Sequence, residues 1–529
     1  MFTNKKTLLA LSVASALVLS GCSDNDNNDP VPPVEEPVAV VVAPEAPIEL
    51  SGVVAGNVVD GTSFDVVAAK VSFFESGTAS TNVVDVDGNV TSSIDSEDGS
   101  FTFQLKDGAS ITQVTAVVVA DGYATKTFII DLSDLGDDSV EVQLGLTSLT
   151  ADGVAAESTD VTVSGGSSAE VVTAAVAQGK AAASVNVPAG TTFQDADGNV
   201  ITGSTVKIAL TAADTSGTAG ALITPEGLNA GSTTVVKKAV AVASVNMSDE
   251  TGTSIKKFSS PITVNMAVPA DKGFATGETL SLSSQNEETG VWTSETQDVT
   301  IGDLSADSSY YNASFMTDHL TFFAATTESA VCASPVRFLF TGDAIPAAGL
   351  KLSASSSDFS FGGLTVKENY TISAAKVAAY GLADDASASV AVKDSDGNSW
   401  FASTGEVALC GDVNVALTAP ADISYVSEAL ALTAQCSNDT ALTTPGSGAL
   451  VKYGRTGKAK RVAKGADGSY ALNDLIEGAS YEVSVKFQGT LAAIGTKTYT
   501  ITADGTDEPQ TEALTCDTTT GATGATGGN

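Results

Sequence analysis

The chain offers one candidate for the histidine base of a catalytic triad, His319, the only histidine among 529 residues. Thr321 follows two positions later, and a general base beside a hydroxyl can turn that hydroxyl into a nucleophile. A single histidine excludes a histidine-rich zinc site. The sequence contains no phosphate-binding glycine loop, no G-x-S-x-G and no H-E-x-x-H. No spacing singles out a glycosidase pair among its 63 carboxylates.

The run Asp318-His319-Leu320-Thr321-Phe322 resembles the last strand of the autoproteolytic, GAIN-type sandwich domains of animal adhesion receptors. The resemblance implies that His319 is the base and Thr321 the nucleophile, with the cut after Leu320. The paired cysteines that flank the animal motif are absent here. The alternative is an ordinary terminal strand with Leu320 and Phe322 packed inside.

Three loops, residues 85–89, 195–199 and 394–398, share the form Asp-x-Asp-Gly-Asn. Alternating carboxylates before a glycine look like the start of a calcium loop, but the full set of ligands of an EF-hand is missing. Asp85 and Asp87, joined by Asp95 and Asp98, form the best calcium candidate. The alternative is a tight turn, because Asp-Gly and Gly-Asn provide the positive φ that such turns need.

The five cysteines fall into one at the N-terminus and four in the second half of the chain. The separations predict two consecutive disulfides, Cys332–Cys410 and Cys436–Cys516, each closing one domain. The nested alternative pairs Cys410 with Cys436 and Cys332 with Cys516. No C-x-x-C pair suggests a metal site.

The N-terminus has the pattern of an export signal. Two lysines precede an apolar run at residues 8–19, which ends in Leu19-Ser20-Gly21-Cys22. This ending resembles the lipobox of bacterial lipoproteins, which implies cleavage before Cys22 and acylation of that cysteine. Ser23, rather than Asp, at the next position implies sorting to the outer membrane.

Composition excludes some partners and suggests the fold class. The net charge of −38 repels nucleic acid and anionic membrane surfaces. It fits solubility in a salty medium, with cation binding as the alternative. Few aromatic residues and abundant Val, Ala, Thr, Ser and Gly favour many short strands. We therefore expect an all-β chain of tandem β-sandwich domains, following a signal peptide (1–21) and a Pro/Asp-rich tether (22–47).

Residues 48–146 carry an opening Ser-Gly-Val strand, a central Asp98-Gly-Ser-Phe101 turn and strand, and a late Gly-Tyr. This order resembles the carboxypeptidase regulatory-like domain, a small prealbumin-like sandwich. Residues 421–517 contain Asp467-Gly-Ser-Tyr470 and a Glu-Gly turn, and resemble the same module.

The rest of the chain is assigned more coarsely. Residues 147–328 look like a large sandwich of bacterial surface proteins, as one domain or two halves. Residues 329–420 form a disulfide-closed sandwich, and residues 518–529 a disordered tail. Trp292 and Trp400 are candidates for an exposed sugar platform, with burial in the core as the alternative.

These observations predict a non-enzymatic lipoprotein, held on the outer membrane by N-terminal lipid and facing the periplasm or the cell surface. Adhesion, glycan binding or scaffolding of an envelope or surface protein would be its role. The alternative is a self-processing surface protein cut between Leu320 and Thr321. No cofactor is expected, apart from calcium at the candidate loop.

Overall fold

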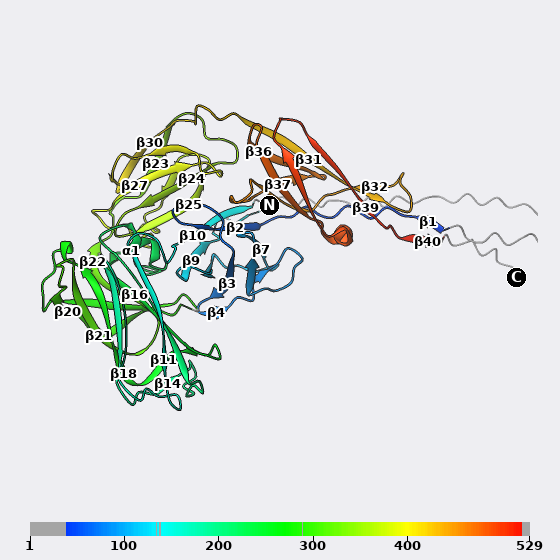
Figure 1. Cartoon of the computed structure of the whole chain (residues 1–529). Coiled ribbons are helices and arrows are strands. Elements are labelled where there is room, and N and C mark those ends of the chain that lie inside the picture. The colour runs from blue at the N-terminus through cyan, green and yellow to red at the C-terminus, as the bar shows by residue number, and fades with distance from the viewer. Residues whose placement is uncertain (1–38, 134, 137–138, 288, 521–529) are drawn as a thin grey trace, which may run out of the picture. The chain divides into compact units, whose positions relative to one another are not determined.

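The computed structural model describes residues 39–133, 135–136, 139–287 and 289–520 (Figure 1). This part of the chain is almost entirely β-structure, arranged as tandem β-sandwich domains, as the sequence predicts. The predicted signal peptide and Cys22 lie outside the described residues. Within them, no helix has the length and apolar character needed to cross a membrane.

The first domain is a sandwich of two sheets, with strand orders β10-β2-β7-β5 and β4-β3-β8-β9, in which β6 also pairs with β3. Phe101 and Phe103 of β7 are buried and alternate with half-buried Thr102, the period of a strand with one face in a core. Gly56 on neighbouring β2 makes room for Phe101, because a Cβ there would lie 1.9 Å from its ring. The strands are β2 (Val53–Asp60), β3 (Ala69–Glu75), β4 (Thr78–Ala79), β5 (Val83–Val84), β6 (Ser93–Ser96), β7 (Ser100–Leu105), β8 (Gln113–Val119), β9 (Lys126–Asp131) and β10 (Val140–Leu146).

The second domain is built on one hydrogen-bonded sheet of twelve strands, in the order β11-β15-β16-β22-β19-β20-β21-β18-β13-β12, with β14 on β18 and β17 on β16. Its elements are β11 (Val154–Thr162), β12 (Val172–Gln178), β13 (Ala181–Val187), β14 (Phe193–Gln194), β15 (Thr205–Ala213), α1 (Thr218–Ile223), β16 (Val235–Asp249), β17 (Ser254–Ile255), β18 (Lys257–Pro269), η1 (Ala270–Lys272), β19 (Thr279–Gln285), β20 (Trp292–Leu304), β21 (Tyr310–His319) and β22 (Phe322–Ala330).

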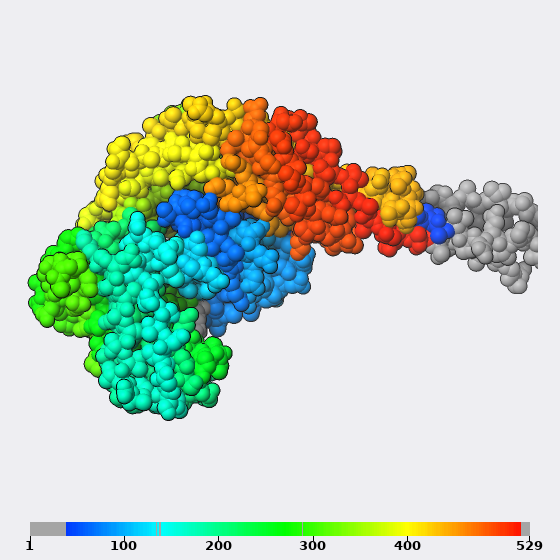
Figure 2. All heavy atoms as spheres, in the orientation of Figure 1, coloured from blue at the N-terminus to red at the C-terminus, as the bar shows by residue number. Residues whose placement is uncertain are grey.

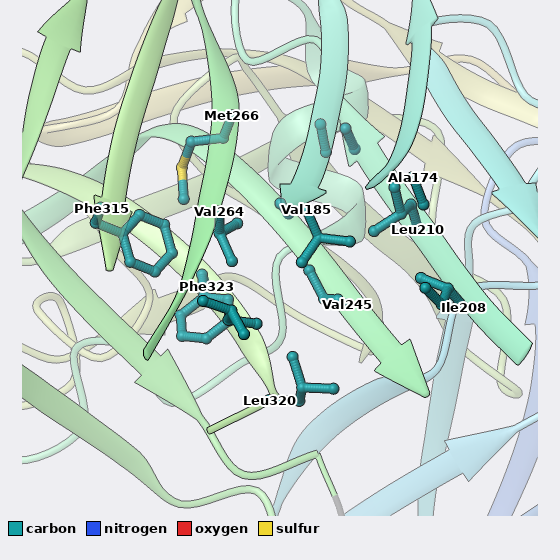
Figure 3. Close-up of a cluster of buried hydrophobic side chains, with 14 of the residues drawn as sticks. Ala174, Val185, Ile208, Leu210, Val245, Val264, Met266, Phe315, Leu320 and Phe323 are labelled. Atoms are coloured by element: carbon teal, nitrogen blue, oxygen red, sulfur yellow. The ribbon is translucent and has the colours of Figure 1, made fainter. Parts of the chain in front are cut away.

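The largest core of this second domain is shown in Figure 3, and a smaller buried cluster, which includes Val154 and Phe322, accompanies it. Ile208 of β15 and Val264 of β18 belong to strands far apart in the sheet order, yet both are fully buried in the largest core. Phe323 of β22 and Leu320, just before that strand, lie in the same cluster. The sheet therefore folds over and closes both of its halves on a shared interior.

The third and fourth domains are smaller two-sheet sandwiches. The third has orders β26-β23-β30 and β25-β24-β27-β28, with β29 on β27. Its strands are β23 (Val336–Gly342), β24 (Leu350–Ser355), β25 (Ser360–Val366), β26 (Tyr370–Ile372), β27 (Ser387–Lys393), β28 (Ser399–Ala402), β29 (Val407–Ala408) and β30 (Gly411–Leu417). The fourth has orders β32-β31-β36-β35, with β39 on β31, and β34-β33-β37-β38. Its elements are β31 (Tyr425–Cys436), β32 (Thr443–Pro445), β33 (Leu450–Gly454), β34 (Arg461–Val462), β35 (Lys464–Ala466), β36 (Ser469–Ile476), β37 (Ser480–Lys486), η2 (Gly489–Ile494), β38 (Thr496–Thr502) and β39 (Glu508–Leu514).

The three small domains close in the same way, with the first strand paired in parallel to the last. The pairs are β2 with β10, β23 with β30, and β31 with β39. Disulfides Cys332–Cys410 and Cys436–Cys516 link the ends of the last two pairs, which is the tandem pairing rather than the nested one. Each bridge therefore holds together strands that are about eighty residues apart.

The two ends of the described chain form a ribbon of their own. In it, β1 (Ala39–Val41) pairs antiparallel with β40 (Thr518–Thr520). The sequence predicted an extended tether up to residue 47 and a disordered tail from residue 518, and the structure corrects both for residues 39–41 and 518–520, which form paired strands. The reason is backbone pairing to a partner 479 positions away, which local composition cannot reveal.

Replacing Cys436 and Cys516 together by serine should destabilise the fourth domain. Closing a loop of 80 residues stabilises a fold by about 4 kcal/mol in the chain-entropy model. Urea unfolding, followed by hydrogen exchange at peptide resolution, measures the loss in β31 and β39. Serine at Cys332 and Cys410 is the matched control, and should weaken the third domain instead. Unchanged exchange in both variants would show that neither bridge constrains its domain.

Candidate functional site

A large share of the chain's few lysine and arginine side chains lies in contacts between domains. Among the residues that the structure describes, at least eleven lysine and arginine side chains touch a residue of a different domain through an ion pair, a hydrogen bond or a ring contact, in a chain that has 25 such side chains. They are Lys126, Lys238, Lys272, Lys351, Lys376, Lys393, Lys452, Arg455, Lys458, Lys460 and Lys486. In a protein with 63 acidic groups, these contacts make the domain junctions the chemically distinctive sites.

The junction of the first and second domains buries two ionisable groups of opposite sign. Lys126 of β9 donates to the carbonyl of Leu222 in α1, at 2.7 Å. The Glu226 carboxylate accepts the backbone N–H of Ile129 at 2.8 Å. Burial lowers the pKa of Lys126 and raises that of Glu226, and the attraction between the two opposes both shifts.

A second buried set of charges lies where the first, third and fourth domains meet, and we call Glu141, Lys351, Asp396, Arg461 and Tyr481 the junction cluster. The Lys351 Nζ lies 2.8 Å from a Glu141 oxygen, and the Tyr481 hydroxyl donates to Asp396 at 3.1 Å. Burial acts to raise the pKa of Glu141, but Lys351 and more distant cations outweigh it, so that pKa is lowered. Burial raises the pKa of Asp396, and Arg461 offsets only part of that effect. Such a set ties three domains together.

A cavity of about 20 Å³ lies beside the junction cluster. Its lining comes from three domains and includes Phe64, Gln143, Lys351, Asp394 and Lys458. A space of this size accommodates about one water molecule. The cavity is therefore a packing feature of the junction rather than a site for a small molecule.

The three Asp-x-Asp-Gly-Asn loops are closed turns. In the first, one oxygen of Asp85 accepts the backbone N–H groups of Asp87 and Asn89, both at 2.9 Å. The same bonds recur at Asp195 and at Asp394. The carboxylate of the first aspartate is thus hydrogen-bonded within its own loop, as expected for a tight turn.

The four carboxylates of the calcium candidate have different partners. Asp87 pairs with Lys486, and Asp98 pairs with Lys460 at 2.9 Å. Asp95 lies on β6, opposite Lys70. Across the described ranges, no three or more His, Cys, Asp or Glu side chains are arranged to hold a metal ion.

His319 ends β21, and its ring faces residues other than Thr321. Nδ1 lies 3.2 Å from the Thr317 hydroxyl and 3.2 Å from Asp318, and Nε2 lies 3.3 Å from Glu295. The Thr321 hydroxyl is buried and has no hydrogen-bond partner in the described part of the chain. The base and the nucleophile that the resemblance implied are therefore near in sequence but not hydrogen-bonded to each other.

Neither tryptophan forms an exposed platform. Trp400 is 5% exposed and belongs to the core of the third domain. Trp292 is half-buried, donates from Nε1 to the Glu226 carbonyl at 2.9 Å and contacts Phe322 edge to face. Both side chains serve packing in this structure.

Sequence reasoning missed the most charged segment of the site. Residues 452–464 hold six basic side chains in thirteen positions and no acidic one. A basic run in a strongly acidic chain is a readable signal for an electrostatic contact. The structure places this segment across β33, β34 and β35, at the junctions with the first and third domains.

No protein-family model and no curated protein matches the chain. Several solved structures share a weak likeness. The Bacillus anthracis TIE protein has 7% identity and a TM-score of 0.13, over 77% of this chain and 55% of that one. The major pilin SpaD of Corynebacterium diphtheriae has 10% identity and a TM-score of 0.14, over 88% and 97%. The major pilin RrgB of Streptococcus pneumoniae has 8% identity and a TM-score of 0.14, over 88% and 99%.

On a denaturing gel, the purified protein should run as one full-length band. His319 is turned toward Thr317, Asp318 and Glu295, and the Thr321 hydroxyl forms no hydrogen bond with it in the described part of the chain. A Thr321→Ala variant is the control and should give the same band. Two fragments from the wild type that disappear in the variant would establish self-cleavage after Leu320.

Gly290→Ala should weaken the contact between the first and second domains. At Gly290, φ is +74°, and a Cβ would lie 2.5 Å from the methyl carbons of both Thr115 and Thr127. Gly277→Ala is the matched control, because φ there is +92° but nothing lies within 4 Å. Both variants carry backbone strain of about 1–2 kcal/mol. Only the first adds a steric clash, of about 1–3 kcal/mol.

Hydrogen exchange in β8 and β9 measures the difference between these two variants. Exchange there should be faster in Gly290→Ala than in Gly277→Ala. Equal exchange in the two variants would show that the close approach of Gly290 does not hold the domains together.

Proposed function

We propose that the chain is a non-enzymatic, lipid-anchored envelope protein of the adhesion or scaffold type, held at the outer membrane through Cys22. Its working part is the set of four β-sandwich domains. The observation that carries the proposal is the way these domains are joined, by buried or half-buried charged contacts that link the first domain to each of the others. The contacts of the first domain with the second and third suit a body that presents a fixed surface to a partner.

Among the roles that the sequence suggested, a protein partner is better supported than a glycan. Sugar binding on sandwiches depends on exposed aromatic faces, and both tryptophans are engaged in packing. The two most exposed large apolar side chains of the second domain, among the residues that the structure describes, are Val171 and Met316, each 58% exposed. We therefore propose contact with an envelope or surface protein, made through polar sandwich faces.

Protease treatment of intact cells tests where the domains act. Peptides from residues 50–517, released without lysis of the outer membrane, support display on the cell surface and hence adhesion. Protection until lysis supports a periplasmic scaffold. Equal amounts of the protein in the culture medium and in the cytosol, with none in the membrane fraction, would contradict both the surface and the periplasmic form of the proposal.

Cys22→Ser should remove the protein from the membrane fraction while leaving it exported and folded. Without the thiol there is no site for the diacylglyceryl group, and a chain without lipid has no stable anchor. Cell fractionation, together with the mass of the N-terminal peptide, measures this. Ser23→Ala is the control, because it changes the adjacent residue and keeps the cysteine. Membrane retention of Cys22→Ser at the level of Ser23→Ala would contradict lipid anchoring at this residue.

A further inference from the structure

The two sides of the contact between the first and fourth domains carry charges of opposite sign. The fourth domain contributes cations, and the first contributes anions or hydroxyls. Lys458 lies 2.7 Å from Asp65, and Lys460 lies 2.9 Å from Asp98. Further pairs join Lys486 to Asp87 and Lys452 to Ser100. Atoms of the first domain (blue) and the fourth (orange to red) meet at this contact in Figure 2.

The charges at this contact are held in place by their surroundings. The side chain of Lys460 is only 10% exposed, and its backbone exchanges two hydrogen bonds of 2.8 Å with the Asn57 amide. Burial acts to raise the pKa of Asp98, but bonds from Lys460 and Ser100 outweigh it and lower that pKa to about 2. Asp98 is therefore ionised at any ordinary pH.

Apolar packing contributes little to the same contact. The shared apolar cluster has three buried members, Val53 and Val86 from the first domain and Leu450 from the fourth. By comparison, the core inside the fourth domain contains seventeen buried residues. The stability of the contact therefore depends on charge much more than the stability of either sandwich does.

Two connecting segments, one at each end of the contact, are placed where they could act as hinges for the fourth domain. Residues 418–424 connect β30 to β31 without regular structure and are largely exposed. At the other end, residues 44–49 bind the fourth domain: the Pro44 carbonyl accepts from Thr444, and the Glu49 carboxylate accepts the backbone N–H of Asp467. Gly52, with φ of +62°, separates this segment from β2.

We propose that the first and fourth domains form a releasable electrostatic clasp, in which the basic segment 452–464 and Lys486 hold Asp65, Asp87 and Asp98 and let go as ionic strength rises. On release the fourth domain carries residues 44–49 with it, gives up the contacts of Tyr481 and Arg455 with Asp396 of the third domain, and turns about residues 418–424 and Gly52. The sandwiches stay folded, because their cores and disulfides are not part of the contact. The clasp goes beyond the proposed function and does not depend on lipid anchoring.

Ionic strength is the first test, on the mature chain without its lipid. The Debye length falls from about 10 Å at 0.1 M salt to about 3 Å at 1 M. Small-angle scattering should show a larger radius of gyration at 1 M NaCl, with unchanged circular dichroism. An unchanged radius, together with unchanged protease sensitivity of residues 418–424, would overturn the clasp.

Charge reversal is the second test. Lys458→Asp with Lys460→Asp should open the clasp already at 0.1 M salt, so that protease cleaves residues 418–424 about tenfold faster or more. Lys180→Asp is the matched control, because Lys180 pairs with Asp271 inside the second domain. It should leave cleavage at the wild-type rate.

A second substitution that restores the ion pair distinguishes opening of the clasp from general destabilisation of the fold. Adding Asp65→Lys to Lys458→Asp restores an ion pair of opposite polarity and should return cleavage toward the wild-type rate. Should the variants at Lys460 fail to fold, Lys486→Asp and its rescue by Asp87→Lys test the same contact at more exposed positions. Reversed pairs that cleave no faster than the Lys180 control would overturn the proposal.

Discussion

The arrangement of the domains depends on a small number of cations placed between acidic surfaces. A chain with a net charge of −38 repels itself, and each domain carries an excess of carboxylates. Lysines at the junctions turn that repulsion into attraction where two domains meet. Isolated ion pairs on the surface contribute little to stability, but Lys351 and Lys460 are only 12% and 10% exposed, and Lys460 pairs with both Asp98 and Glu482. The first domain is held in this way by all three of the others.

Inside each small domain, a different constraint operates. The first and last strands lie side by side in parallel, so each sandwich is closed by residues from its two ends. A parallel pair requires a long connection, and here the connection is the rest of the domain. The disulfides of the third and fourth domains fasten this closure covalently. The first domain has no disulfide and is instead surrounded by contacts from the other three.

The sequence predicted the parts of the structure that depend on local pattern. The alternation around Phe101 marked a strand, the Asp-Gly-Asn loops marked turns, and cysteine spacing indicated the two bridges. Contacts between domains were not predictable in the same way. Lys126 and Glu226 are a hundred residues apart, and nothing near either residue indicates its burial. The basic segment 452–464 was readable, but its partners, Asp65 and Asp98, belong to ordinary turns and strand ends.

Buried charge at a junction acts differently from apolar packing. Removing one partner leaves the other buried and unpaired, which costs about 3–5 kcal/mol, whereas replacing both by apolar groups is often neutral. Such contacts therefore discriminate between alternative dockings more than they add stability. For Glu141, a docking that moved Lys351 away would leave a carboxylate without its counter-charge.

By the same argument, the junctions between domains in this chain fall into two kinds. Where both partners are largely buried, as in the pair of Lys351 and Glu141, whose side chains are 12% and 20% exposed, the domains have one favourable arrangement. Where they are half-exposed, as at Asp65 and Asp87, water and salt can replace the partner at little cost, and the contact can open.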